Sequence, residues 1–261
     1  YGGAITVNAL NITDLVADSR GGNGYGYSGG GGGNAGAIAI TTANIANAQL
    51  HAPGGYAYYG ADGASGAIGL HAPTASDITV AGVEAPFNAI SVQANGGRIL
   101  PGSSVYGANI RAQNMDIVLL ANGGIGVSEA NPLTVAGDTP SSVDFQNTGS
   151  GNVYIAAYGG NAFDGDLAIW SGVNHVGSIF LSTGGAGKTL TKDPGTGISA
   201  AADIHYVADN LVLGGPTQAG ASATITVEPY TSTRPIALVS TVDPGSLSLT
   251  AAMIESFHGG T

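Results

Sequence analysis

Gly36-Ala37-Ile38 begins the alternating stretch GAIAI at residues 36–40, and the same tripeptide occurs at residues 3–5 and 66–68. The number of residues between the first and second copies is nearly the same as the number between the second and third copies. Each copy leads into a short run in which large apolar residues alternate with smaller ones, which is the pattern of a β-strand with one buried face. The recurrence of such a strand at a nearly constant interval predicts a repeat protein.

Similar alternating runs continue along the whole chain, separated by Gly, Asn, Asp and Pro. Examples are ITV at residues 78–80, IVL at 117–119 and LSL at 247–249. The apolar residues in these runs follow a period of two rather than the spacing of an amphipathic helix. The sequence therefore predicts an all-β protein.

Two all-β architectures have strands at this spacing, the β-solenoid and the β-sandwich. A sandwich seldom extends to 261 residues as one domain, and no linker or change of composition divides this chain. We therefore predict one β-solenoid domain over residues 1–261, folded as a single continuous rod. At about 22 residues per coil, the rod would contain on the order of 12 coils.

The composition excludes several partners and chemistries. Six Lys and Arg against 17 Asp and Glu give a net charge of −11, so the chain lacks the cations that nucleic-acid binding requires. The absence of Cys removes disulfides, thiolate metal sites and Cys nucleophiles together. No apolar run approaches the roughly 18 residues of a membrane span, so membrane insertion is not expected.

The most unusual segments are two Gly/Tyr-rich loops within residues 15–75. They read GGNGYGYSGG at residues 21–30 and GGYAYYG at residues 54–60. Tyr combines an apolar ring with a polar tip, and neighbouring Gly lets another chain approach closely, so these loops are the predicted contact surface. Packing of the rings back over the rod is the alternative, and carbohydrate stacking is another. The candidate contact residues are Tyr25, Tyr27, Tyr56, Tyr58 and Tyr59.

Carboxylates offer a weaker candidate site. Asp164 and Asp166 flank a Gly and could face the same side of a coil, as paired acids do in β-helical enzymes that cleave polysaccharides. Asp-Gly-Asp is also an ordinary solvated turn. A weak Ca²⁺ site built from Asp138, Asp144, Asp164 or Asp166 is a further alternative.

Two histidines offer another weak candidate site. His51 and His71 occupy matching Leu-His-Ala-Pro contexts, at residues 50–53 and 70–73, so they could stack on successive coils and share a metal ion. The matching repeat context explains them without a metal, and no third ligand is evident. We therefore predict no metal ligand, no catalytic residue and no resident cofactor, and the chain is not expected to be an enzyme.

Three segments resemble the filamentous-haemagglutinin-like family of very large secreted adhesins and autotransporter-type proteins. The first reads MDIVLLANGGIG at residues 115–126 and continues into ANPLTV at 130–135. The second reads GSIFLSTGG at residues 177–185. The third is the C-terminal run ATITVEPYT at 223–231, RPIAL at 234–238 and GSLSLTAAMI at 245–254. Together they place the resemblance in residues 105–261.

The resemblance implies a right-handed parallel β-helix that is exported from a Gram-negative bacterium to the cell surface or the medium. It implies a structural or adhesive function, either as one repeat of a longer chain or as a subunit in a stacked fibre. The expected partners are copies of the same module, joined end to end or in tandem, and host or matrix glycans. A secreted protein that binds or degrades polysaccharides on the same solenoid is the alternative function.

Overall fold

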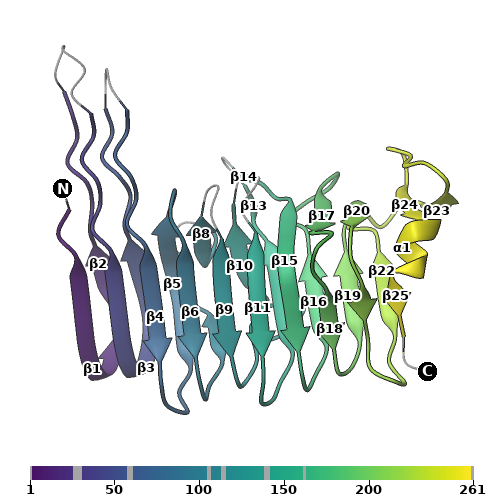
Figure 1. Cartoon of the computed structure of the whole chain (residues 1–261), viewed down its shortest axis with the longest axis horizontal. Helices are drawn as coiled ribbons and strands as arrows, with labels where there is room; N and C mark the ends of the chain where they lie inside the picture. Colours follow the sequence, from purple (N-terminus) through teal and green to yellow (C-terminus); the bar gives the residue numbers. More distant parts are fainter. Residues whose placement is uncertain are drawn as a thin grey trace.

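The computed structural model describes residues 2–25, 31–57, 61–104, 107–112, 116–137, 142–160 and 163–259. Its main sheet has 21 strands, and all of the pairings within this sheet are parallel. Figure 1 shows these strands stacked side by side along one axis, with the two ends of the chain at opposite ends of the stack. The predicted all-β parallel β-helix is confirmed.

The strands are short, and most are separated by turns rich in Gly, Asn and Asp. In chain order they are β1 (Ile5–Thr13), β2 (Val16–Asp18), β3 (Ile38–His51), β4 (Ile68–Ala72), β5 (Ile78–Ala85), β6 (Ile90–Ala94), β7 (Ile99–Pro101), β8 (Ile110–Ala112), β9 (Ile117–Ala121), β10 (Leu133–Ala136), β11 (Val143–Asn147), β12 (Val153–Ala157), β13 (Gly159–Gly160), β14 (Phe163–Asp164), β15 (Leu167–Asn174), β16 (Ile179–Ser182), β17 (Thr189–Lys192), β18 (Ile198–Ala200), β19 (Ile204–Val207), β20 (Asn210–Leu213), β21 (Thr217–Gln218), β22 (Ile225–Glu228), β23 (Ile236–Val239), β24 (Leu247–Thr250) and β25 (Phe257–His258).

Two columns of register partners run the length of the rod and fill its interior. The first column consists of Val7, Ile40, Leu70, Val92, Leu119, Phe145, Gly172, Ile198, Thr217 and Phe257. The second consists of Ile12, Ile45, Ile78, Ile99, Ile125, Val153, Ile179, Ile204 and Ile225. Nearly all members away from the two ends are buried. Burial of each large aliphatic side chain contributes about 1.5–3 kcal/mol.

The coils are longer than expected. Along the second column, the intervals from Ile12 to Ile45 and from Ile45 to Ile78 are about one and a half times the expected coil length, and most later intervals also exceed it. The second column therefore holds nine positions and the first holds ten, fewer than the roughly 12 coils expected. At roughly 4.8 Å per strand, these nine positions span about 38 Å. The difference arises because loops between strands, which do not add coils, take up many residues.

The C-terminal coil departs from the pattern. β23 and β24 form a separate two-stranded parallel sheet, and the short helix α1 (Ala251–Glu255) follows directly. Thr250 caps this helix, because its side chain accepts a hydrogen bond from the backbone N–H of Met253. The buried Met253 side chain anchors the helix to the end of the rod. Figure 1 shows α1 beside β24 at the yellow end of the chain.

Candidate functional site

The two Gly/Tyr-rich loops pack against each other. They occupy residues 19–37, between β2 and β3, and residues 52–67, between β3 and β4. Backbone hydrogen bonds join them from Gly21 N to Pro53 O (3.0 Å), from Gly24 N to Tyr56 O (2.9 Å) and from Gly55 N to Gly33 O (2.8 Å). Figure 1 shows both loops projecting past the strands at the N-terminal end. The stack of coils therefore continues out into the loops.

Glycine is needed where these backbones meet. A Cβ on Gly21 would collide with the Gly33 carbonyl and with the Gly55 amide, whose hydrogen bond joins the two loops, and a Cβ on Gly32 would collide with the Gly55 carbonyl. The colliding atoms belong to backbone, which cannot move aside as a flexible side chain would. The glycines at these positions thus serve contacts within the chain.

Gly21→Ala is expected to separate the two loops, because the new methyl group has no space next to the Gly33 carbonyl and the Gly55 amide, whose hydrogen bond joins the loops. Amide hydrogen exchange measured by mass spectrometry should become at least about tenfold faster in residues 31–36 and 52–57, while exchange in β9 stays unchanged. Gly22→Ala is the matched control, since nothing lies within 4 Å of a Cβ at that position. Equal exchange rates in the two variants would contradict this account of the loops.

The candidate tyrosines are only partly described. Tyr25 and Tyr56 are exposed by 73% and 56%, so neither ring packs back over the rod. Asn23 connects them, because its Nδ2 donates to the Tyr25 hydroxyl (3.1 Å) and its Oδ1 accepts from the backbone N of Tyr56 (3.0 Å). Tyr27, Tyr58 and Tyr59 lie outside the described residues. As a contact surface, this group of tyrosines stays a prediction.

The structure does not bring the two histidines together. His51 is the register partner of Glu84, whereas His71 pairs in register with Gln93 on a different side of the coil. The alternative of a metal shared by His51 and His71 is therefore excluded. Within the described ranges, no group of three or more His, Asp or Glu side chains is placed to hold a metal ion.

Instead, His51 belongs to a ladder of charged groups that crosses four coils. Asp18, His51, Glu84 and Arg111 are successive register partners. The buried Glu84 carboxylate lies 2.7 Å from His51 Nε2 and 2.7 Å from Arg111 Nη1, and Arg20 Nη2 donates to Asp18 (2.9 Å). Burial disfavours the ionised Glu84 carboxyl, but the His51 hydrogen bond and the Arg111 charge outweigh this effect and lower the pKa of Glu84.

Asp164 and Asp166 do face the same side of the rod. They flank Gly165, which has a φ of +79°, and Asp164 Oδ1 accepts a hydrogen bond from the backbone N of Asp166 (3.1 Å). Of the other acids considered for Ca²⁺, Asp144 instead accepts a hydrogen bond from Ser171, and Asp138 lies outside the described residues. The two described acids of the turn line one wall of a groove.

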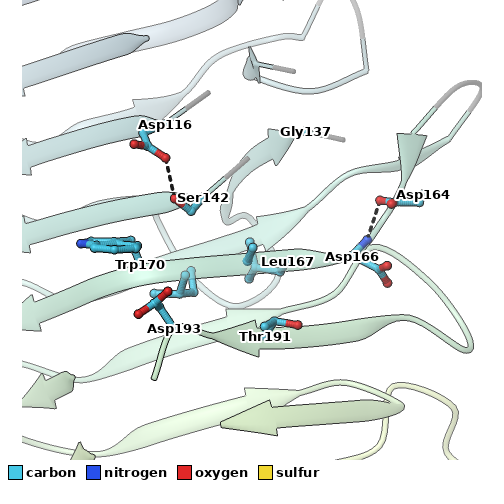
Figure 2. Close-up of a pocket in the computed structure, with 11 residues that line it drawn as sticks. Asp116, Gly137, Ser142, Asp164, Asp166, Leu167, Trp170, Thr191 and Asp193 are labelled. Carbon is cyan, nitrogen blue, oxygen red and sulfur yellow. Dashed lines mark hydrogen bonds between the residues drawn. The ribbon is translucent and has the colours of Figure 1, made fainter. Parts of the chain in front are cut away.

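This groove has a volume of about 430 Å³. Its lining includes Asp116, Asp164, Asp166, Trp170, Thr191 and Asp193. Figure 2 shows Trp170 and Asp193 on one side of Leu167, with Asp164 and Asp166 on the other. The groove crosses the strands, because Ile117, Val143, Ile169 and Lys192 are successive register partners beneath it.

Trp170 owes its position to an irregularity in the sheet. Val143 pairs with Ile169, but the next residue, Asp144, pairs with Ser171. One extra residue is thus inserted in β15, and such a bulge redirects the side chains around it. The indole of Trp170 is 49% exposed. Sequence reasoning missed Asp116, Trp170 and Asp193, because the register that unites them joins successive coils that are distant in sequence.

Both ends of the rod present strand edges. β1 pairs with β3 only, and its second edge has no partner among the described strands. At the opposite end, β22 pairs only with β19 and β25 pairs only with β21 within the part of the chain described. Apolar side chains accompany these edges: Leu10 and Val16 are exposed at the first end, and Ile225 and Val227 are partly exposed at the other.

No family model, curated protein or solved structure matches this chain. Membership of the filamentous-haemagglutinin-like family therefore stays a prediction from the quoted motifs. In the described part of the chain, no helix is both long and apolar enough to cross a membrane.

Proposed function

We propose that this chain is a structural and adhesive segment of an extracellular bacterial fibre or surface adhesin, and that further β-coils stack on both of its ends. The observation that carries the proposal is that strand edges with no partner among the described strands occur at both ends, in the same two columns. Such edges are templates for another strand. Coils of the same kind suit them, because a solenoid gains its stability from contacts between neighbouring coils.

The two ends match in register. At one end β1 alone contributes Val7 to the first column and Ile12 to the second. At the other end these columns finish with Phe257 in β25 and Ile225 in β22. A coil with the β1 pattern would therefore place a Val over Phe257 and an Ile over Ile225, continuing both hydrophobic columns and both rows of backbone hydrogen bonds.

Secretion from a Gram-negative cell, which the resemblance implies, belongs to the same proposal. The role is mechanical and adhesive, and it involves no catalytic step. The alternative of a protein that binds or degrades polysaccharides draws its support from the groove around Trp170, which lies on the side of the rod and not at its ends.

The test compares self-association of the wild-type chain with that of a Val7→Lys/Ile12→Lys variant. We expect sedimentation velocity and negative-stain electron microscopy to reveal linear stacks of the wild type that lengthen with concentration. The two Lys substitutions place a charge in each hydrophobic column and should abolish the stacks, because both Lys side chains would have to be buried at the junction between two copies. Thr6→Lys, at an outward-facing position of the same strand, is the control and should stack normally.

A covalent tandem of two copies covers the case in which one polypeptide supplies the coils. If coils pack across the junction, the tandem should unfold at a higher urea concentration than the single chain, and the lysine substitutions in its second copy should remove the difference. A single chain that stays monomeric at all concentrations, together with a tandem no more stable than one copy, would refute the proposal.

A further inference from the structure

We infer that the groove around Trp170 binds a linear glycan without acidic groups, lying along the axis of the rod with one sugar ring stacked on the indole. This inference is independent of the stacking at the ends, because all of the residues involved lie on one side of the rod. It rests on the direction of the groove, the exposed Trp170, the hydrogen-bonded carboxylates that line the groove and the negative charge of the groove.

The direction of the groove fits an extended polymer. One set of buried register partners runs beneath the groove, and the residue before each of them points outward. These outward-facing residues form a row across four strands: Asp116, Ser142, Ala168 and Thr191. Three strand spacings of roughly 4.8 Å make this row about 14 Å long. A chain of several sugar units along the axis would contact the whole row.

Trp170 provides an apolar platform beside that row. A single exposed apolar residue is common on protein surfaces and needs no explanation. Here, however, the indole lies at a bulge in β15 and at the edge of a groove with polar groups on either side. An aromatic face suits the C–H face of a sugar ring, while the surrounding acceptors suit its hydroxyl groups.

The four Asp side chains are already oriented. In each, one oxygen accepts a hydrogen bond: Asp116 from Ser142 Oγ (2.6 Å), Asp164 from Asp166 N (3.1 Å), Asp166 from Thr189 N (2.7 Å) and Asp193 from Gly195 N (2.8 Å). No described residue donates to the second oxygen of these four carboxylates. Hydrogen bonds from hydroxyl groups to a carboxylate are stronger than those to neutral acceptors.

Charge decides the class of glycan. Among the described residues, the groove is lined by four Asp and by no Lys, Arg or His, on a chain of net charge −11. Uronic acids or sulfated sugars would be repelled. The four carboxylates are also spread along the groove, since no three of them are placed to share one cation. This distribution favours hydroxyl groups along a neutral polymer over a single concentrated positive charge.

The experiment uses the fluorescence of Trp170, which is the single Trp of the chain. The probes are neutral oligosaccharides of β-glucan, xylan and mannan, the acidic polymers polygalacturonate and heparin, and oligolysine as a cationic peptide. We expect at least one neutral glycan to change the emission saturably, with an affinity that about 0.5 M NaCl leaves unchanged. The acidic polymers should have no effect.

Variants assign that binding to the groove. Calorimetric titration should show that Trp170→Ala weakens the affinity about tenfold or more, and that Asp193→Asn weakens it several-fold. Phe87→Ala removes an aromatic side chain that is exposed by 51% elsewhere on the rod, and should bind normally. Asp203→Asn is the control for charge, because Asp203 also accepts one backbone hydrogen bond from the next coil, from Thr224 N.

Three outcomes would overturn the inference: no response to any neutral glycan, binding of an acidic polymer in preference, or salt-sensitive binding of oligolysine alone. The titrations are repeated on the Val7→Lys/Ile12→Lys variant, which removes stacking at the ends. Normal glycan binding by this variant would show that binding in the groove does not depend on stacking at the ends. Either proposal can therefore fail without the other.

Discussion

Replacing Asn147 with alanine is expected to lower the free energy of unfolding by about 3 kcal/mol. Asn147 is fully buried, and its Nδ2 donates to the carbonyls of Ser150 (2.8 Å) and Gly151 (3.1 Å) and to Oδ1 of Asn174 (3.0 Å). Its Oδ1 accepts from the backbone N of Gly124 (3.0 Å). Alanine would remove all four hydrogen bonds, and the bonds to Gly124 N and Asn174 Oδ1 are buried.

Sterically, alanine suits the position. The other register partners in this column are Ala72, Ala94, Ala121, Asn174 and Ala200. A large loss in Asn147→Ala would therefore report the hydrogen bonds rather than the shape of the column. Urea unfolding followed by circular dichroism measures the change, with the neighbouring exposed Gln146→Ala as control, expected within about 0.5 kcal/mol of wild type. A loss below about 1 kcal/mol would show that the turn closes without Asn147.

Glu84→Gln is expected to cost about 2 to 3 kcal/mol at pH 7, because it removes the buried charge that holds His51 and Arg111. The effect should depend on pH. The Glu84 pKa is lowered from its ordinary value of 4.5, so the unfolded chain takes up this proton first as the pH falls. The stability that the folded carboxylate contributes is therefore complete above about pH 5 and is lost as the pH falls through the lower, folded pKa.

The measurement compares the urea midpoints of wild type and Glu84→Gln between pH 7 and pH 3. Their difference should be large at pH 7 and should shrink at the acid end. Asp77→Asn serves as the control, since Asp77 pairs with Arg98 at 2.6 Å but both side chains reach solvent, so the expected loss is at most about 1 kcal/mol. Equal losses in the two variants at pH 7 would contradict a special role for the buried carboxylate.

Local patterns were sufficient to predict most of the fold. The alternation around Ile38, Ile68 and Ile117 marks strands whose inward residues do become register partners. Stacking followed from the repeat, because short one-faced strands gain a core only from their neighbours. The number of coils was overestimated, since sequence alone does not distinguish a residue in a strand from one in a long loop.

The candidate site was predicted only in part. Asp164 and Asp166 were identified because they are close in sequence, and they do lie at the groove. Asp116, Trp170 and Asp193 carried no local signal, because each is an ordinary residue in or next to a strand. Their juxtaposition depends on the bulge in β15 and on the lengths of the loops between coils.

The sequence by itself determined the class of this protein: strands of period two that recur along the chain specify an all-β solenoid. Only the tertiary structure decided which side chains meet across coils. It places the loop glycines against backbone of the same chain, and it buries Lys192 inside the rod, where its Nζ donates to the Thr196 carbonyl (2.9 Å). The physical reason is that strand pairing fixes neighbours through register, and the register between coils is set by the loops, turns and bulges along the whole length of each coil.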